Sequence, residues 1–271
     1  MVCKICKADS RKVFSKVVLG RHHVDYHLCA SCGFLQTDEP FWLDEAYASA
    51  LSIFDTALVA RPLGFRAPIC RLIQKHLDPN GRFLDFGGGA GLFARMMRDL
   101  GYDFYWDDKY AENVFAKGFD LNSLQPENRR FSLVTAFEVM EHVPDPMPVF
   151  HQLTEQGGNF LFSTELQPED GFPLANWAYL GEQHGQHVSF YTVNALKYVA
   201  SKLGLHYHRC GKYLHLYSTN PIRVDLDPNP LWQRWPLQKL SGLWNLLTRC
   251  DRYWLTRRSP VQAGQPATDR R

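Results

Sequence analysis

The stretch that indicates the fold of this chain is Phe83-Leu84-Asp85-Phe86-Gly87-Gly88-Gly89-Ala90-Gly91-Leu92-Phe93-Ala94. A short apolar run ends in glycines, and a pattern typical of a helix follows from Leu92 to Leu100. The order of strand, tight turn and helix is how a doubly wound, mostly parallel α/β sheet begins. Glycines suit such a turn because a ligand must approach bare backbone, and the first N–H groups of the helix are free at the same edge.

The glycine spacing distinguishes between two kinds of cofactor. A dinucleotide fingerprint reads G-x-G-x-x-G, whereas Gly87, Gly89 and Gly91 alternate and Leu92 takes the last position of that pattern. The run beginning at Asp85, D-x-G-x-G-x-G, resembles motif I of class I S-adenosylmethionine (SAM) dependent methyltransferases. The resemblance implies a Rossmann-like methyltransferase sheet and SAM as cofactor, with Asp85 holding its amino-acid end directly or through water. The alternative is a glycine-rich turn that binds no ligand.

Two later stretches agree with this resemblance. Residues 101–108 predict a second strand that ends in Asp107 and Asp108, where a Rossmann-type unit meets ribose hydroxyls. Asp108 aligns with the family's strand-end acid, and Asp107 is the second candidate. Residues 131–143 resemble the family's fourth-strand segment, although Ser132 stands where Asp is usual. The cofactor residues implied are Asp85, Phe86, Gly87, Gly88, Gly89, Gly91, Asp108 and Phe137.

Glu141 and His142 follow that strand, and this pair recurs in small-molecule and sugar methyltransferases. Two interpretations remain open at this stage. The pair takes part in catalysis, or it anchors the loop through hydrogen bonds.

Four of the seven cysteines form two C-x-x-C pairs at the amino terminus, Cys3 with Cys6 and Cys29 with Cys32, separated by 22 residues. Each pair puts two thiolates on one tight turn, and two such turns make a tetrahedral zinc site. Because four thiolates leave no position for water, this zinc is expected to be structural. Strands over 14–19 and 24–28 with a turn at 20–23 connect the pairs. The alternatives are redox cysteine pairs, or zinc ligation that includes His22, His23 or His27.

A segment further along is the best candidate for catalysis. Residues 182–191 follow an aromatic loop (172–180) and resemble the part of zinc-containing sugar C-methyltransferases that carries Tyr-x-Glu-His before Ser and aromatics. The family's histidine falls on His187, its glutamate on Gln186 and its tyrosine on His184, so two of the three differ. A histidine has the pKa to take a proton near neutral pH. A carboxylate beside it must come from elsewhere, such as Glu182 or Glu141, and O-methylation is therefore at least as well supported as C-methylation. A histidine that only fixes the loop is the alternative.

The organisation predicted along the chain has five parts. They are a zinc-binding module (1–45), a connector with a covering helix (46–80), the methyltransferase domain (81–220), an amphipathic extension (221–258) and a disordered tail (259–271). Tyr47 and Arg61 in the connector lie where side chains could approach the cofactor pocket, but packing or surface roles are favoured. The pattern predicts strands over 83–86, 102–106, 131–136 and 159–164, a hairpin over 206–218, and helices over 65–77, 92–100, 111–117, 145–155 and 194–203.

Composition narrows the class of protein further. Of 271 residues, 45% are hydrophobic and 21% charged, as in globular proteins, and the net charge of +2 predicts no nucleic-acid partner. An apolar leader before Cys3 and a long apolar run are both missing from the sequence, so a cytoplasmic enzyme is expected. Trp and Arg residues at helical spacing over 237–258 are typical of a membrane-surface helix or of one packed on a protein, and the second is favoured.

The function predicted is methyl transfer from SAM to a small-molecule or sugar acceptor, with His187, His184, Glu141 and His142 as the candidate catalytic residues. The sugar acceptor, free as a nucleotide conjugate or on a glycan, comes from the resemblance alone. Two alternatives are a non-catalytic protein that keeps the cofactor fold while its zinc module binds a partner, and a nicotinamide-dependent oxidoreductase. The intact glycine motif disfavours the first and Leu92 the second.

Overall fold

The structure is a computed structural model, and it describes residues 1–48, 57–168, 171–223 and 226. All elements below lie in the compact unit formed by Met1–Ala50 and Val59–Pro228; of the second unit, Leu51–Leu58 and Asn229–Arg271, only residues 57 and 58 are described. The predictions for residues 221–258 and 259–271, apart from residues 221–223 and 226, therefore fall outside the described residues.

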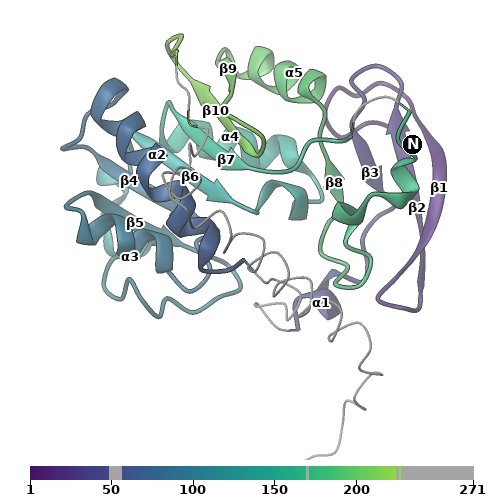
Figure 1. Cartoon of the computed structure of the whole chain (residues 1–271), viewed down its shortest axis with the longest axis horizontal. Coiled ribbons are helices and arrows are strands. Elements are labelled where there is room, and N and C mark those ends of the chain that lie inside the picture. The colour runs from purple at the N-terminus through teal and green to yellow at the C-terminus, as the bar shows by residue number, and fades with distance from the viewer. Residues whose placement is uncertain (49–56, 169–170, 224–225, 227–271) are drawn as a thin grey trace, which may run out of the picture. The chain divides into compact units, whose positions relative to one another are not determined.

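A six-stranded sheet in the order β5-β4-β6-β7-β10-β9 forms the centre of the fold (Figure 1). Its first four strands are parallel, and the last two pair antiparallel. The strands are β4 (Arg82–Phe86), β5 (Asp103–Asp107), β6 (Leu133–Phe137), β7 (Phe160–Ser163), β9 (His206–Arg209) and β10 (Leu214–Ser218). The predicted fold class, a mostly parallel α/β sheet of the Rossmann-like kind, is confirmed.

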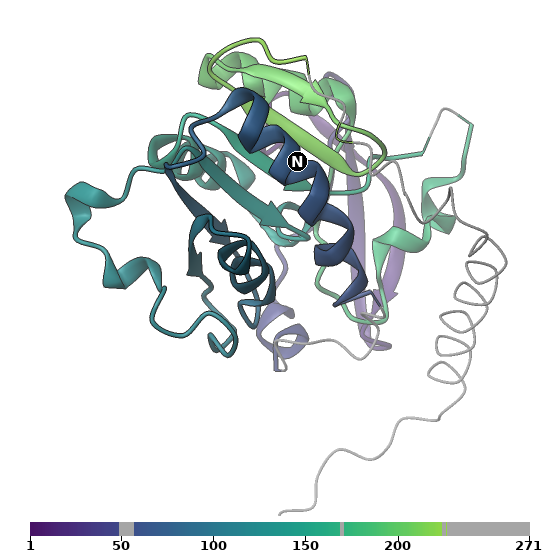
Figure 2. The ribbon, with the colours of Figure 1, turned by 60° about the vertical axis from the view of Figure 1, so that its left-hand side comes forward.

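Helices cover both faces of this sheet. The helices α2 (Ala60–His76) and α3 (Leu92–Asp99) pack on one face, which Figure 2 shows with α2 lying across it. The helices α4 (Pro146–Gln156) and α5 (Val193–Leu203) pack on the other. Successive strand residues alternate between the two cores: Phe83 belongs to the α2–α3 side and Leu84 to the α4–α5 side. Because both faces of the strands are buried, their sequences are short, nearly continuous apolar runs.

The predicted helix over 111–117 is wrong. The segment forms bends and turns, and two short 3₁₀ turns follow it (Leu121–Ser123 and Pro126–Asn128). Asn113 explains the difference, because its side chain donates to Ala116 O at 2.8 Å and accepts from Ala116 N at 2.9 Å. Such local bonds from asparagine compete with the backbone bonds of a helix.

The amino-terminal module has its own sheet, in the order β1-β2-β3-β8. A hairpin of β1 (Ser10–Val18) and β2 (His22–Cys29) turns at residues 19–21, one position before the predicted turn, and β3 (Leu35–Thr37) pairs with β2. The fourth strand, β8 (Ser189–Phe190), comes from the middle of the chain. A one-turn helix α1 (Leu43–Ala46) follows the module.

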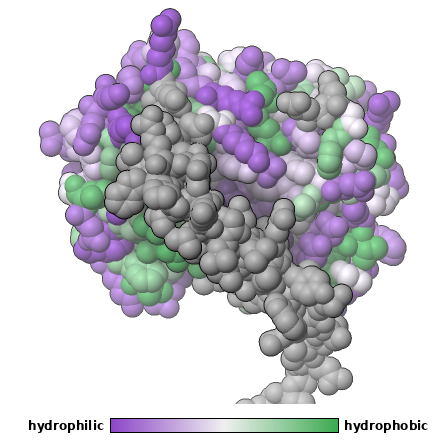
Figure 3. Space-filling model, in the orientation of Figure 1, coloured by the Kyte–Doolittle hydropathy of each residue, from purple (hydrophilic) through white to green (hydrophobic). Residues whose placement is uncertain are grey.

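Two surface observations complete the fold. Among the described residues, no helix has both the length and the hydropathy needed to cross a membrane. Polar and apolar side chains are interspersed over the part of the face in Figure 3 that the described residues form.

Candidate active site

The glycine loop follows β4 at the carboxyl end of the parallel strands. Gly87 N and Gly88 N donate to Asp107 O at the end of β5, at 2.8 and 3.2 Å. A Cβ at Gly87, Gly88 or Gly91 would lie 2.5 to 2.7 Å from a neighbouring side-chain atom, so these glycines are needed for packing. Gly89, whose φ is +54°, differs because a Cβ there would meet no atom within 4 Å. The loop backbone is therefore open at Gly89, where a ligand can lie against it.

Asp85 lies buried beneath this loop. Its Oδ1 accepts from Thr135 Oγ1 on β6 at 2.8 Å, and its Oδ2 faces the Cα of Gly88. Burial raises the pKa of this carboxyl to about 7, and the nearby charge of Asp108 acts in the same direction. A cationic group at the open side of the loop would stabilise the ionised form.

Asp108 ties the end of β5 to the glycine loop. Its Oδ2 accepts from Gly89 N at 2.9 Å, and its Oδ1 accepts from the backbone N–H groups of Tyr110 and Ala111 at 2.7 and 2.8 Å. One carboxylate oxygen therefore sits at the one loop position that is open. Asp107 lies next to it, and burial raises the pKa of that carboxyl.

The two aromatic residues predicted to bind the cofactor lie at the ends of their strands. Phe137 packs its ring against Phe65 of α2 and Phe93 of α3, with ring centroids 4.7 and 5.0 Å apart. Phe86 is partly buried and packs on the α4–α5 side. Both are thus placed mainly by the cores of the domain.

The four candidate catalytic residues come together from two distant segments. Glu141 and His142 lie in a 3₁₀ turn (Met140–His142) after β6, and His184 and His187 precede β8. The ring centroids of His142 and His187 are 4.9 Å apart, and those of His184 and His187 are 4.7 Å apart. Side-chain ligand atoms of Glu141, His142 and His187 all lie within 4.8 Å of one another.

His187 has a defined tautomer. Its Nδ1 lies 2.5 Å from the main-chain oxygen of Tyr179. A carbonyl oxygen only accepts, so Nδ1 carries the hydrogen and the lone pair of the neutral ring is on Nε2. Burial, with the neighbouring His142 and His184, holds the pKa of His187 well below its usual range. The ring is therefore neutral near pH 7, with one nitrogen unprotonated.

Glu141 is fully buried beside this histidine. Its Oε1 accepts from the Tyr179 hydroxyl at 2.6 Å, and its Oε2 has no hydrogen-bond partner in the described part of the chain. Burial, and then the charge of Glu138, raises the pKa of Glu141 to about 8.

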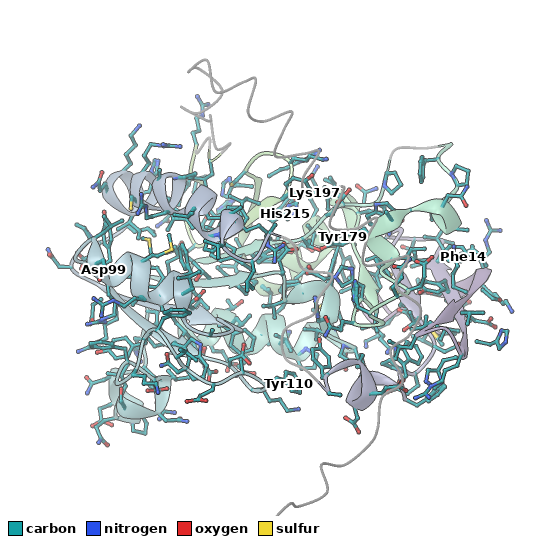
Figure 4. The ribbon with its side chains drawn as sticks, turned by 60° about the horizontal axis from the view of Figure 1, so that its bottom comes forward. Phe14, Asp99, Tyr110, Tyr179, Lys197 and His215 are labelled. Carbon is teal, nitrogen blue, oxygen red and sulfur yellow. The ribbon has the colours of Figure 1, made fainter. Side chains whose placement is uncertain are left out.

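Tyr179 also bonds to Thr164. Figure 4 shows Tyr179 beside His215. The Tyr179 hydroxyl lies 3.3 Å from Thr164 Oγ1, and His215 Nε2 lies 3.2 Å from Thr164 O.

Gln186 and Glu182, the two other polar residues considered as partners of His187, bond to other groups. Gln186 donates from its Nε2 to Ala46 O at 3.0 Å, and Glu182 forms an ion pair with Lys16 at 3.6 Å. Of the two carboxylates considered from the sequence, Glu141 is therefore the one that belongs to the cluster with His187.

Three residues of the cluster were not among the predicted site residues. Tyr179 contacts both Glu141 and His187, as described above. Tyr47 lies with its hydroxyl 2.6 Å from His142 Nδ1, and its ring stacks on Tyr110 with centroids 4.5 Å apart. Glu138 has a φ of +55° and accepts from Ser163 Oγ at 2.6 Å. A positive φ at a residue other than glycine is uncommon, and no sequence pattern signals it here.

The four amino-terminal cysteines form a second cluster. Cys3 Sγ lies 3.6 Å from Cys32 Sγ, and Cys6 Sγ lies 3.4 Å from Cys29 Sγ. Backbone N–H groups of Cys6 and Cys32 point at the sulfurs of Cys3 and Cys29, each at 3.5 Å. The hydrogen bond with Cys32 lowers the pKa of Cys3 to about 5. In a tetrahedral zinc site with Zn–S bonds of about 2.3 Å, the sulfurs lie about 3.8 Å apart, so this donor set fits zinc.

Comparisons with known proteins give one family and several relatives. A family model described as "Methyltransferase domain" matches residues 61–209. The chain is 31% identical over 153 residues to a ubiquinone biosynthesis O-methyltransferase of Xanthomonas axonopodis pv. citri (strain 306), and the alignment covers 49% of this chain and 64% of that protein. The chain thus spans less than two thirds of that relative.

The comparisons also found solved structures. Human N-acetylserotonin methyltransferase in complex with SAM has a TM-score of 0.47 and 15% identity, covering 68% of this chain and 60% of that one. Magnesium protoporphyrin IX methyltransferase from Synechocystis PCC 6803, with bound SAH, has a TM-score of 0.44 and 14% identity, covering 65% and 90%.

Proposed function

We propose that this chain, which belongs to the methyltransferase-domain family as predicted, transfers a methyl group from SAM to a hydroxyl group of a small-molecule or sugar acceptor. The observation that supports the proposal most directly is the neutral His187, whose lone pair is on Nε2, beside the buried carboxyl of Glu141. This arrangement lies near the carboxyl ends of β6 and β7, the edge where the glycine loop lies.

The residues around the glycine loop fit SAM. The open backbone at Gly89 leaves room for a nucleoside, the Asp108 carboxylate at the same place can accept from ribose hydroxyls, and Asp85 offers a buried negative charge to the amino-acid end. When bound, SAM supplies a methyl group on a sulfonium. The protein's own contribution is to hold the acceptor in line and to exclude water.

His187 is proposed as the group that takes the acceptor's proton. Its Nε2 accepts the proton, and Tyr179 O keeps the ring in place through Nδ1. Gln186 donates to Ala46 O in α1 and cannot supply a charge, so deprotonation of carbon, which is much harder than that of a hydroxyl, has less support. The relative's name as an O-methyltransferase agrees with this choice. The sugar acceptor rests on the resemblance of residues 182–191 to sugar methyltransferases.

The proposal can be tested by mass spectrometry of nucleotide sugars, glycan precursors and small phenols incubated with the protein and methyl-labelled SAM. His187→Ala should lower label transfer at least about 100-fold, the lower end of general-base contributions, while SAM affinity stays the same. His151→Ala, at an exposed position on α4, is the matched control. Full transfer by His187→Ala would remove this histidine from the base role.

We also propose that the four cysteines bind a structural zinc ion. Their sulfur separations and the N–H groups that point at two of the sulfurs support it. Such an ion would stabilise the module's fold and take no part in methyl transfer.

A further inference from the structure

The segment that carries the candidate base, residues 182–192 (the histidine segment), is bound to the amino-terminal module through its backbone. Strand β8 pairs antiparallel with β3, with Leu35 opposite Phe190 and Gln36 opposite Ser189. Thr37 N donates to Val188 O at 3.2 Å, and Leu19 N donates to Glu182 O at 2.8 Å. Both ends of the segment are therefore held by strands and turns of the module.

Trp42 fixes the middle of the segment. Its indole Nε1 donates to Gly185 O at 2.8 Å, and the side chain is only 2% exposed. Gly185 has a φ of +66°, and a Cβ there would lie 2.9 Å from Val18. The backbone two residues before His187 thus packs directly against β1, with no space for a shift.

The second cysteine turn is tied to the same segment. Gln167, after β7, donates from its Nε2 to both Gly33 O at 2.7 Å and Phe190 O at 2.9 Å. Thr192 Oγ1 donates to Cys32 O at 2.6 Å. The turn that carries Cys32 and Gly33 is therefore linked to the histidine segment through the side chains of Gln167 and Thr192.

A hydrophobic core joins the two parts as well. Val18, Tyr26 and Trp42 of the module form one buried cluster with residues from the middle of the chain, Trp177, Leu180, Val188 and Phe190. The glycine loop, Asp85 and Asp108 lie elsewhere, on β4, β5 and the loops that follow them. The histidine segment also bonds to the turn after β6, with Val188 N donating to Glu141 O at 2.9 Å and Ser189 Oγ to Val143 O at 2.6 Å, so the module shares its support with the methyltransferase domain.

We propose that the amino-terminal module (residues 1–45) is the platform that positions the histidine segment, where the acceptor would lose its proton. Trp42 and Gln167 are the positioning residues that hold His187 beside Glu141. This inference rests on the proposed function in assigning His187 as the base. It predicts that the module's contacts control proton transfer and leave SAM binding unaffected, because no described contact of the module reaches Gly87–Gly91 or Asp85.

The test compares two variants of the full-length, metal-loaded protein. Trp42→Phe removes the indole N–H and keeps an aromatic ring, and Gln167→Glu puts a carboxylate oxygen where the amide now donates to two carbonyl oxygens. Ser15→Ala is the control, because Ser15 lies on β1 and bonds only to Asp25 among the described residues. The readouts are amide hydrogen exchange of residues 182–190, NMR titration of the His187 ring, and calorimetric titration with SAM.

We expect exchange in residues 182–190 to rise at least about tenfold in both variants, corresponding to about 1.4 kcal/mol of lost protection. The pKa of His187 should rise toward its ordinary value, because burial is what lowers it. SAM affinity should stay within about twofold of the parent. Ser15→Ala should match the parent in all three readouts.

Unchanged exchange in both variants would overturn the platform role, and so would a loss of SAM affinity in parallel with the loss of protection. These outcomes are separate from the test of the base itself. If His187→Ala kept full methyl transfer while both variants loosened the segment, the proposed base would fail and the platform role would stand.

Discussion

Tyr179 donates its hydroxyl hydrogen to Glu141 Oε1 at 2.6 Å, across 38 residues of sequence. The second oxygen of the buried carboxyl has no partner among the described residues, so this bond is the main support for the group. The main-chain oxygen of the same tyrosine holds His187. One residue thus positions both the carboxyl and the histidine.

Tyr179→Phe should therefore affect Glu141 without releasing His187. Because the bond from Tyr179 lowers the pKa of Glu141, its loss should raise that pKa further above about 8. The free energy of unfolding above that pH should fall by about 1–3 kcal/mol, the cost of an unsatisfied buried polar group. Urea titrations and carboxyl NMR would check this, with the exposed Tyr213→Phe as control. An unchanged Glu141 titration would contradict the expectation.

Gly89→Ala should weaken SAM binding while leaving the fold intact. The methyl group meets no protein atom within 4 Å but would occupy the open side of the loop. Gly118→Ala is a matched control, since Gly118 also has a positive φ, of +85°, and open space around it, but lies outside the loop. Each change should cost about 1–2 kcal/mol of stability from backbone strain. Only Gly89→Ala should lower SAM affinity, by at least about tenfold in calorimetry.

The roles of Asp107 and Asp108, at the end of β5, can be distinguished by amide substitution. Asp108→Asn should lower SAM affinity by about 1.5–3 kcal/mol, the value of hydrogen bonds to a charged group, because its Oδ2 lies at the open Gly89. Asp107→Asn should change the affinity by less than about threefold. The opposite ranking in calorimetric titrations would assign the ribose hydroxyls to Asp107.

The ionisation of Asp85 should make stability depend on pH. Its pKa is raised from 3.8 to about 7 in the folded state, so folding favours the protonated form. The contribution is complete below the unfolded pKa and is lost as pH rises toward 7, at about 1.4 kcal/mol per pH unit. Asp85→Asn, which cannot ionise, should show a flatter profile in cofactor-free urea titrations. Parallel profiles for the parent and the variant would contradict the raised pKa.

Zinc removal should unfold the module. Elemental analysis of reduced protein should find one zinc ion per chain, and Cys29→Ser should lose it because the site needs four thiolates. Cys70→Ser, at a partly buried cysteine of α2, is the control and should keep the zinc. Reduced parent protein without zinc would overturn this assignment.

Much of the fold could be predicted because its signals are local. The glycine loop and the apolar strands are specified by residues next to one another, and all the predicted strands of the central sheet formed. The helix predicted over 111–117 failed because the Asn113 side chain bonds to the backbone of Ala116, which periodicity cannot reveal. The three-residue strand β3 was also missed, being too short for a periodic pattern.

The sequence by itself determined that the glycine loop and Asp108 lie at one edge of the sheet, since a strand, its glycines and a following acid are placed by chain connectivity alone. Tertiary structure decided which groups surround His187. Glu141 reaches it because the turn after β6 and the segment before β8 meet, where Val188 N donates to Glu141 O at 2.9 Å and β8 joins the module's sheet as its fourth strand. Contacts across such separations follow from strand order and packing, which residue spacing does not encode.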